Sequence, residues 1–213
     1  MVTLYFKKNE DDILNDLKSL VDRSVELGAD RALIITPDKV VVDDRVRAKC
    51  RYPPCPGYAT SLMCPPHSMD PEETRKLTKL YKQAILVRVD VDPKDAAGPK
   101  ARKRKAYHPY ATKLHNIINQ LESEAFYKGY YLALGFENGG CRLCSPSSEK
   151  IKCEGLNTGM CTHPMDARPS MESVGIDVYA TVNGVGWDIY PIGRESDPTQ
   201  TPCAGFYGLL FVL

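Results

Sequence analysis

The sequence has little that would place the protein in a membrane or outside the cell. It contains no run of 18 apolar residues, so we expect no helix that spans a membrane. The first residues, Met-Val-Thr-Leu-Tyr-Phe-Lys-Lys, lack the apolar core and the cleavage site of a secretory signal. The formal net charge is only +1, so overall charge indicates no partner. We therefore expect a cytoplasmic protein with no membrane partner.

Histidine is also scarce, and it forms no recognisable catalytic or metal-binding pattern. The four histidines are separated in sequence and include no His-x3-His pair; they are His67, His108, His115 and His163. No Ser/His/Asp or Cys/His arrangement of a nucleophile can be argued from the sequence, and the glycines of residues 135–140 do not follow a phosphate-loop pattern. The sequence thus leaves open whether the protein is an enzyme.

Cysteine, in contrast, is abundant. Seven of the eight cysteines lie in two Pro- and Gly-rich segments, which we call the first cysteine loop (residues 48–68) and the second cysteine loop (residues 138–168). Thiols stay reduced in the cytoplasm, so disulfides are not expected there. Cysteines at this density therefore predict metal binding or redox chemistry.

The second cysteine loop offers a complete set of four soft ligands. Its spacing is Cys-x2-Cys-x8-Cys-x7-Cys, formed by Cys141, Cys144, Cys153 and Cys161. Thiolates bind both zinc and iron–sulfur clusters, but zinc ribbons usually present two Cys-x2-Cys pairs and this loop has one. We predict that these four residues bind a [4Fe-4S] cluster, with zinc as the alternative metal.

The first cysteine loop offers three thiols, Cys50, Cys55 and Cys64. A fourth ligand would have to be Cys203 or His67. With Cys203 as ligand the protein would hold two closed clusters, one per loop. Without it, a cluster in this loop would keep one open iron, a Lewis-acidic position that can bind a substrate. Cys203 can equally be a small buried apolar residue.

The residues around these cysteines resemble a known family. The motifs are Lys49-Cys50, Cys55-Pro56-x-Tyr58 and Cys64-Pro65-Pro66, together with Cys141-x2-Cys144, Cys161-x-His163-Pro164 and the run Ala167-Arg-Pro-Ser-Met-Glu-x-x-Gly-Ile-Asp-Val178. They resemble a cysteine-rich family known as predicted metal-binding protein, found mainly in archaea and anaerobic bacteria. The resemblance covers roughly residues 30 to 213 and implies an iron–sulfur cluster. The family usually has a tight Cys-x2-Cys-x2-Cys, whereas here Ser145–Lys150 separates Cys144 from Cys153.

Two residues of this signature are candidate cofactor-binding residues. Pro169 and the three residues after it look like a helix start, whose free N–H groups can donate to cluster sulfurs. Arg168 can do the same or bind an anionic ligand, the alternative being a structural salt bridge. His163 can donate to a sulfur, the alternative being a hydrogen-bonded loop residue.

Alternating helical and strand patterns predict a single domain, residues 1–213, of the α/β or α+β class, with helices packed on a mixed β-sheet. The expected helices are residues 10–27, 70–82, 107–128 and 169–174. The expected strands are residues 32–35, 40–42, 84–91, 130–136, 176–182, 185–190 and 206–213. Asn183-Gly184 predicts a hairpin between two of them.

These features predict an iron–sulfur protein of anaerobic metabolism that transfers electrons, with a redox partner protein. One alternative is an enzyme that binds its substrate at an open iron. The other is a zinc adaptor or nucleic-acid-binding module, because Lys100–Lys105 places five cations in six residues. The sequence predicts no oligomeric state.

Overall fold

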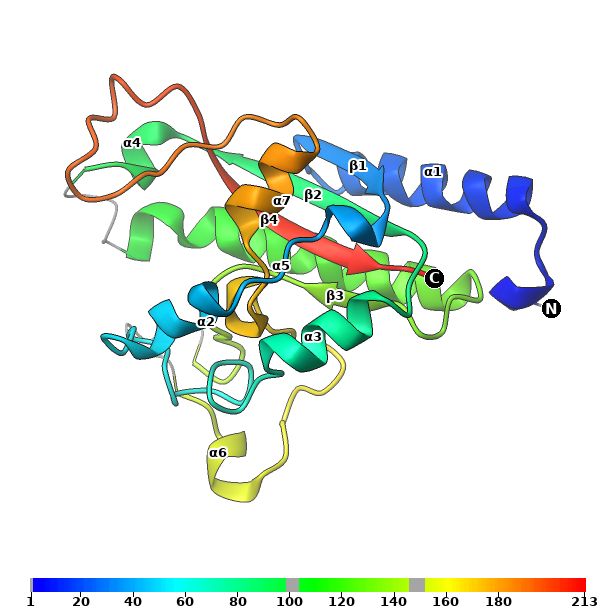
Figure 1. The fold of residues 1–213 in the computed structure, drawn as a ribbon, viewed down its shortest axis with the longest axis horizontal. Helices are drawn as coiled ribbons and strands as arrows, with labels where there is room; N and C mark the ends of the chain where they lie inside the picture. Colours follow the sequence, from blue (N-terminus) through cyan, green and yellow to red (C-terminus); the bar gives the residue numbers. More distant parts are fainter. Residues whose placement is uncertain (1, 99–103, 146–151) are drawn as a thin grey trace.

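The computed structural model describes residues 2–98, 104–145 and 152–213, and it centres on a four-stranded sheet (Figure 1). The strands are β1 (Arg31–Ile35), β2 (Ala84–Val91), β3 (Leu134–Phe136) and β4 (Ala204–Phe211), in the order β1-β2-β4-β3. All three pairings are antiparallel, with Leu33 opposite Leu86 and Leu86 opposite Leu209. The α+β class is confirmed. The expected mixture of parallel and antiparallel pairs is wrong: β2 and β3 run in the same direction, but β4 lies between them and is antiparallel to both.

Two long helices cover one face of the sheet, and both were predicted. α1 (Glu10–Glu26) begins at Asn9, whose side chain accepts a hydrogen bond from the Asp12 N–H group at 2.8 Å. α5 (Arg104–Tyr127) buries apolar side chains at three- and four-residue spacing; these are Leu114, Ile117, Ile118, Leu121 and Ala125. They pack against the apolar residues of β2 and β4 that point to this side. In Figure 1, α5 runs behind β4.

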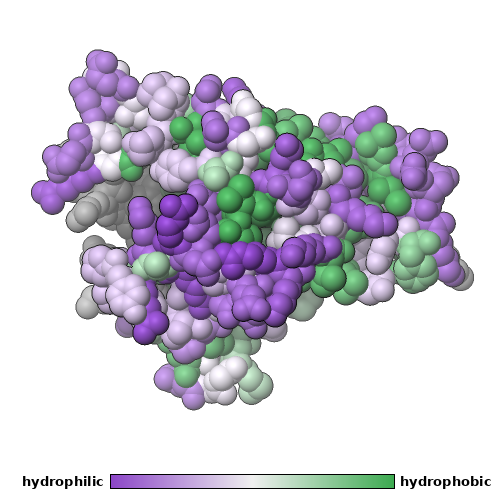
Figure 2. All heavy atoms as spheres, viewed as in Figure 1, coloured by the Kyte–Doolittle hydropathy of each residue, from purple (hydrophilic) through white to green (hydrophobic). Residues whose placement is uncertain are grey.

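The opposite face of the sheet carries a second apolar layer. It is formed by η4 (Glu172–Val174) and α7 (Val178–Gly184), and α7 lies in front of β4 in Figure 1. Met171, Ile176 and Val182 are fully buried against Leu86 and Phe211. Figure 2 shows hydrophilic residues over most of this side of the molecule, with smaller hydrophobic areas between them.

The predicted hairpin of residues 176–190 is wrong. Residues 178–184 form α7, and Asp177 caps it by accepting the Ala180 N–H group at 3.0 Å. Val178, Thr181 and Val182 are buried on one side of this helix, so packing and the cap outweigh the strand preference of the β-branched residues. Asn183-Gly184 ends the helix, and residues 185–190 form no strand. Of the predicted strand 40–42, only Val42 makes a bridge, to Ile176.

The remaining elements are short. They are η1 (Tyr5–Lys7), η2 (Pro37–Lys39), α2 (Asp44–Arg51), α3 (Pro71–Thr78), α4 (Pro93–Ala96) and α6 (Gly155–Thr158). The predicted capping box of α3 is present between Asp70 and Glu73. Of the basic segment Lys100–Lys105, residues 100–103 lie outside the described residues. Within the described part of the chain, no helix is long and apolar enough to cross a membrane.

Candidate metal centre

The signature segment, residues 167–178, anchors the second cysteine loop to the sheet. The Glu137 N–H group, directly after β3, donates to the Pro169 carbonyl at 3.0 Å, and the Met171 N–H group donates to the Glu137 carbonyl at 2.9 Å. These bonds form a parallel bridge between Glu137 and Ser170. The bridge joins the two ends of the second cysteine loop, because the loop leaves at Asn138 and returns at Arg168.

The same segment anchors the approach to the first cysteine loop. The Asp43 N–H group donates to the Gly175 carbonyl at 2.9 Å, and the Asp177 N–H group donates to the Val41 carbonyl at 2.8 Å. Gly175 has a φ of +89°, a conformation that disfavours residues with a side chain, and it turns the chain from η4 toward Asp177. The Arg47 guanidinium, on α2, donates to the Ser173 carbonyl at 3.0 Å. One segment therefore positions both loops.

Arg168 closes the second cysteine loop against α5. Its Nε donates to Glu122 Oε2 at 2.7 Å, and its Nη1 donates to the Ala167 carbonyl at 2.8 Å. Its Nη2 also donates to the Met165 carbonyl at 3.2 Å. The structure therefore shows the salt-bridge role for this guanidinium. A contact between Arg168 and a cofactor stays a prediction.

The thiols of the first cysteine loop are partly or fully buried. Cys50 lies in the last turn of α2, and its carbonyl accepts the Cys55 N–H group at 2.9 Å. Cys64 is only 5% exposed. Burial, and then the neighbouring thiol of Cys55, raise the pKa of Cys50 to about 11 and that of Cys64 to about 12. The loop thus gathers sulfurs where uncompensated negative charge is unfavourable.

The two cysteine loops meet at Cys64 and Cys141. The Cys141 N–H group donates to the Cys64 sulfur, and the charge of Cys141 also acts on that thiol. Burial raises the pKa of Cys141 to about 11, and its neighbours include Glu137, Cys161 and Cys144. Cys141 therefore interacts electrostatically with thiols of both loops.

Cys153 forms a second contact between the loops. Burial alone would raise its pKa, but hydrogen bonds from the Leu62 and Gly155 N–H groups and from the Ser61 hydroxyl lower it. Leu62 and Ser61 belong to the first cysteine loop. In Figure 1, α6, which follows Cys153, lies below the segment that contains the first loop. Residues 146–151, including most of the Ser145–Lys150 segment, are outside the described residues.

The remaining thiols of the second loop accept or share hydrogen bonds with nearby residues. Cys144 Sγ lies 3.3 Å from Thr162 Oγ1, and Cys161 Sγ accepts the His163 N–H group at 3.4 Å. The group of His163 that donates to sulfur is thus its backbone N–H. Donation by its ring stays a prediction.

Cys203 and His67, the two candidates for a fourth ligand of the first loop, have other surroundings. Cys203 lies directly before β4, and its Sγ donates to the Asp188 carbonyl at 3.7 Å. Its charge acts on Arg88 and Tyr207. His67 is exposed, and its N–H group donates to the Cys64 carbonyl at 3.0 Å. Neither ligand role is tested by these contacts.

The donor set fits a thiophilic metal or cluster in its chemistry. The seven thiols of the two loops are at least partly buried, and N–H groups donate to several of their sulfurs, an arrangement that supports metal-bound thiolates. Across residues 2–98, 104–145 and 152–213, however, no group of three or more His, Cys, Asp and Glu side chains is already arranged to hold a metal ion. The sulfurs approach one another without a finished ligand set.

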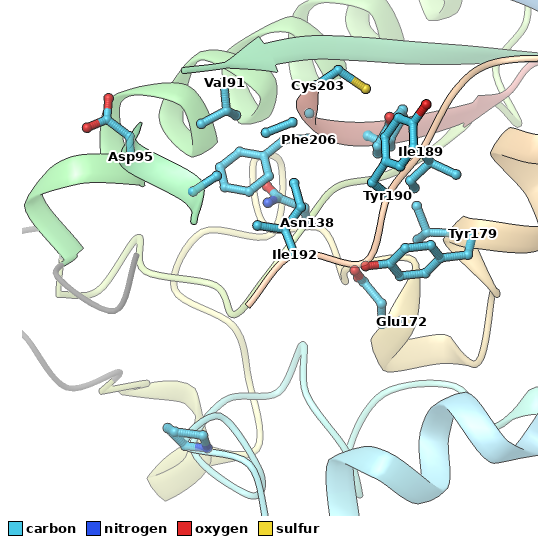
Figure 3. Close-up of a pocket in the computed structure, with 16 residues that line it drawn as sticks. Val91, Asp95, Asn138, Glu172, Tyr179, Ile189, Tyr190, Ile192, Cys203 and Phe206 are labelled. Carbon is cyan, nitrogen blue, oxygen red and sulfur yellow. The ribbon is translucent and has the colours of Figure 1, made fainter. Parts of the chain in front are cut away.

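The sequence did not indicate two cavities that adjoin this centre. One, of about 850 Å³, is lined by Pro56 of the first loop, by Asn138 and by Glu172 (Figure 3). The other, of about 350 Å³, is lined by Cys141 and by a buried pair in which His115 Nδ1 lies 2.6 Å from Glu137 Oε2. This hydrogen bond raises the pKa of His115, and burial raises that of Glu137. The one sequence signal for a role of Glu172 is its place in the signature segment, residues 167–178.

An α+β scaffold that gathers partly buried thiols from two loops defines a class of protein with the ligands for a soft metal. The comparison with protein families agrees: the chain belongs to the family described as predicted metal-binding protein (DUF2284), whose model matches residues 33–211. The matched region includes both cysteine loops and every strand of the sheet except the first two residues of β1. No curated protein and no solved structure matches the chain.

Proposed function

We propose that the protein binds iron–sulfur through the thiols of its two cysteine loops and uses it to transfer electrons to a partner protein. The observation that carries the proposal is the meeting of the loops, at Cys64 with Cys141 and at Cys153 with Leu62. Sulfurs from both loops are thus neighbours, as a polynuclear cluster or two adjacent clusters would require.

The surroundings of the sulfurs support a redox role. Backbone N–H groups donate to the sulfurs of Cys64, Cys153 and Cys161. Such hydrogen bonds stabilise the more negative, reduced state of an iron–sulfur cluster and therefore raise its potential. A [4Fe-4S] cluster would supply the one-electron step, and the chain would contribute the ligands, the hydrogen bonds and partial exclusion of water.

The division of ligands is part of the proposal. Cys141, Cys144, Cys153 and Cys161 hold one cluster, and Cys50, Cys55 and Cys64 hold a second or an open-iron cluster. Because Cys141 adjoins the Cys64 sulfur, electrons can pass between two such clusters over a short path. Cys203 is the candidate fourth ligand only if metal binding draws it toward the first loop.

Anaerobic purification with iron, sulfide and zinc analysis tests the proposal. We expect brown protein whose visible absorption falls on addition of dithionite, with about eight irons per chain for two clusters and about four for one. Colourless protein with stoichiometric zinc, from cells grown with ample iron, would contradict the redox function. It would favour the zinc adaptor, whose affinity for nucleic acid through Lys100–Lys105 would fall steeply with salt.

A further inference from the structure

The cavity of about 850 Å³ has the size of a site for a small organic molecule. It lies between the sheet and the chain that follows α7, and Figure 3 shows Phe206, Ile192 and Tyr179 around it. Its walls combine aliphatic side chains with four aromatic rings, those of Tyr179, Tyr190, Phe206 and Tyr207. An apolar or aromatic ligand body would be covered by such walls.

Two residues that line this cavity each carry a buried oxygen without a hydrogen-bond partner. These oxygens are Oε2 of Glu172 and Oδ1 of Asn138. Buried polar atoms in native proteins are almost always hydrogen-bonded, so a pair of unsatisfied acceptors in one cavity indicates a missing donor. In Figure 3 the Glu172 carboxyl points up beside the end of Tyr179, and the Asn138 amide lies across the cavity from it. Each oxygen would gain a partner if a ligand donor entered beside it.

The charge of the lining favours a cation. Among the described lining residues, Asp95 and Glu172 carry carboxyl groups and none is Lys or Arg. Burial raises the pKa of Glu172, so an ammonium group beside it would stabilise the ionised carboxylate that burial alone disfavours. Arg88, which lies over the Tyr207 ring with its guanidinium carbon 5.9 Å from the centroid, is paired with Asp90. Aromatic faces also attract organic ammonium groups. The carboxyl groups, the Asn138 amide oxygen and the aromatic rings therefore all favour a ligand with a positively charged head group.

We propose that this cavity binds a small organic amine, with its ammonium group beside the Glu172 carboxyl and its apolar body among the aromatic residues. The site adjoins the metal centre, because Pro56 follows Cys55 directly and the charge of Glu172 acts on Cys50. A bound amine would therefore lie beside the first cysteine loop. The binding itself does not depend on which metal the loops hold.

Isothermal titration of the anaerobically purified protein tests this site. The probes are 2-phenylethylamine and two compounds of the same shape, the alcohol 2-phenylethanol and the acid 3-phenylpropionate. We expect saturable binding of the amine with a Kd of about 0.1–1 mM, and binding of the alcohol and the acid at least about tenfold weaker. Equal binding of the three compounds, or no saturable binding of the amine, would overturn the proposal.

Two variants assign the binding to this cavity. Glu172→Gln keeps the shape of the side chain and should weaken amine binding about tenfold. Ile192→Trp, on the irregular segment after α7, should fill the cavity and abolish binding even if the Glu172 variant fails to fold. Glu72→Gln, an exposed glutamate on α3, is the matched control and should bind like the wild type. Unchanged binding in Ile192→Trp would overturn the assignment. Iron content is measured in the same samples, so loss of amine binding can be told from loss of metal.

Discussion

At the scale of single residues, Arg168 and Glu122 hold the end of the second cysteine loop on α5. Both side chains are about 13–14% exposed, and Glu122 also accepts the Gly135 N–H group at 2.6 Å. Arg168→Met would leave the Glu122 carboxylate partly buried without its cation. We expect the free energy of unfolding to fall by about 2 kcal/mol, a value reduced for partial solvent exposure.

Urea denaturation of the protein as purified measures this change, with metal content determined for each sample. Arg45→Met is the matched control, because Arg45 pairs with Asp43 on the surface and should change the midpoint little. If both variants unfold at the wild-type midpoint, Arg168 does not hold the loop.

Asp16 gives a pH-dependent contribution to stability. Burial alone would raise its pKa, but hydrogen bonds from Lys8 and the Tyr130 hydroxyl lower it below the ordinary 3.8. A lowered carboxyl pKa stabilises the fold above the unfolded-state value, and this stabilisation is lost as the pH falls through the folded-state value. Asp16→Asn should therefore cost about 1 kcal/mol at pH 7 and progressively less below about pH 4. Thermal unfolding across this range checks it; a constant difference at all pH values would contradict it.

The residue types in the sequence predicted the chemistry of the metal centre, but they did not predict as well which of its residues contact one another. Seven clustered cysteines indicate soft-metal ligation wherever they lie. The contact between Cys64 and Cys141 depends on hydrogen bonds that join Glu137 to Pro169 and Asp43 to Gly175. The residues of these two pairs are 32 and 132 positions apart in the sequence (169 − 137 and 175 − 43). No local pattern encodes such pairs. The same is true of the unsatisfied oxygens of Asn138 and Glu172.

At the scale of elements, strong periodicity and clear caps were enough for α1, α3, α5, β2 and β4. α7 was missed because its sequence, Val-Tyr-Ala-Thr-Val, has the composition of a strand and precedes Asn-Gly. The packing that favours a helix here involves Met171 and Ile176, which lie on the sheet in the folded protein. The local sequence pattern does not show this packing. Tertiary packing thus decided an ambiguous segment.

The Asp177 side chain, which caps α7, should stabilise this helix and its packing on the sheet. Its carboxylate accepts the Ala180 N–H group, and its own N–H group donates to Val41. Asp177→Ala removes the first bond and keeps the second, so we expect a loss of about 1 kcal/mol in the free energy of unfolding. Asp177→Asn should retain most of it. Urea titration distinguishes the two, and equal stability of Asp177→Ala and the wild type would show that the cap does not hold α7.

At the scale of the whole molecule, the sheet and its two apolar layers form the scaffold from which both cysteine loops extend. The cysteine loops are tied to this scaffold at their ends, by Arg47, Arg168 and the Glu137–Ser170 bridge. Between these ties the structure shows thiols that approach one another without a finished ligand set. Metal would therefore order the two loops together.

Removal of the metal tests this coupling. We expect hydrogen exchange of residues 50–64 and 141–161 to rise together when the protein is treated with a chelator, because the loops share one centre. Amides of β2 and β4 should keep their protection, since both strands are buried between the two layers. Faster exchange in only one loop would show that the loops are independent.

The most direct test of the central claim is the iron content of three single variants purified anaerobically beside the wild type. Cys64→Ser and Cys153→Ser each remove a thiol that contacts the other loop, whereas Cys203→Ser removes the thiol beside Asp188. A centre formed by both loops predicts that the first two variants lose iron and change the visible spectrum. The iron content of Cys203→Ser shows whether Cys203 is the fourth ligand of the first loop: a loss would assign it that role, and the wild-type content would exclude it. Full iron content in Cys64→Ser or in Cys153→Ser would contradict the claim.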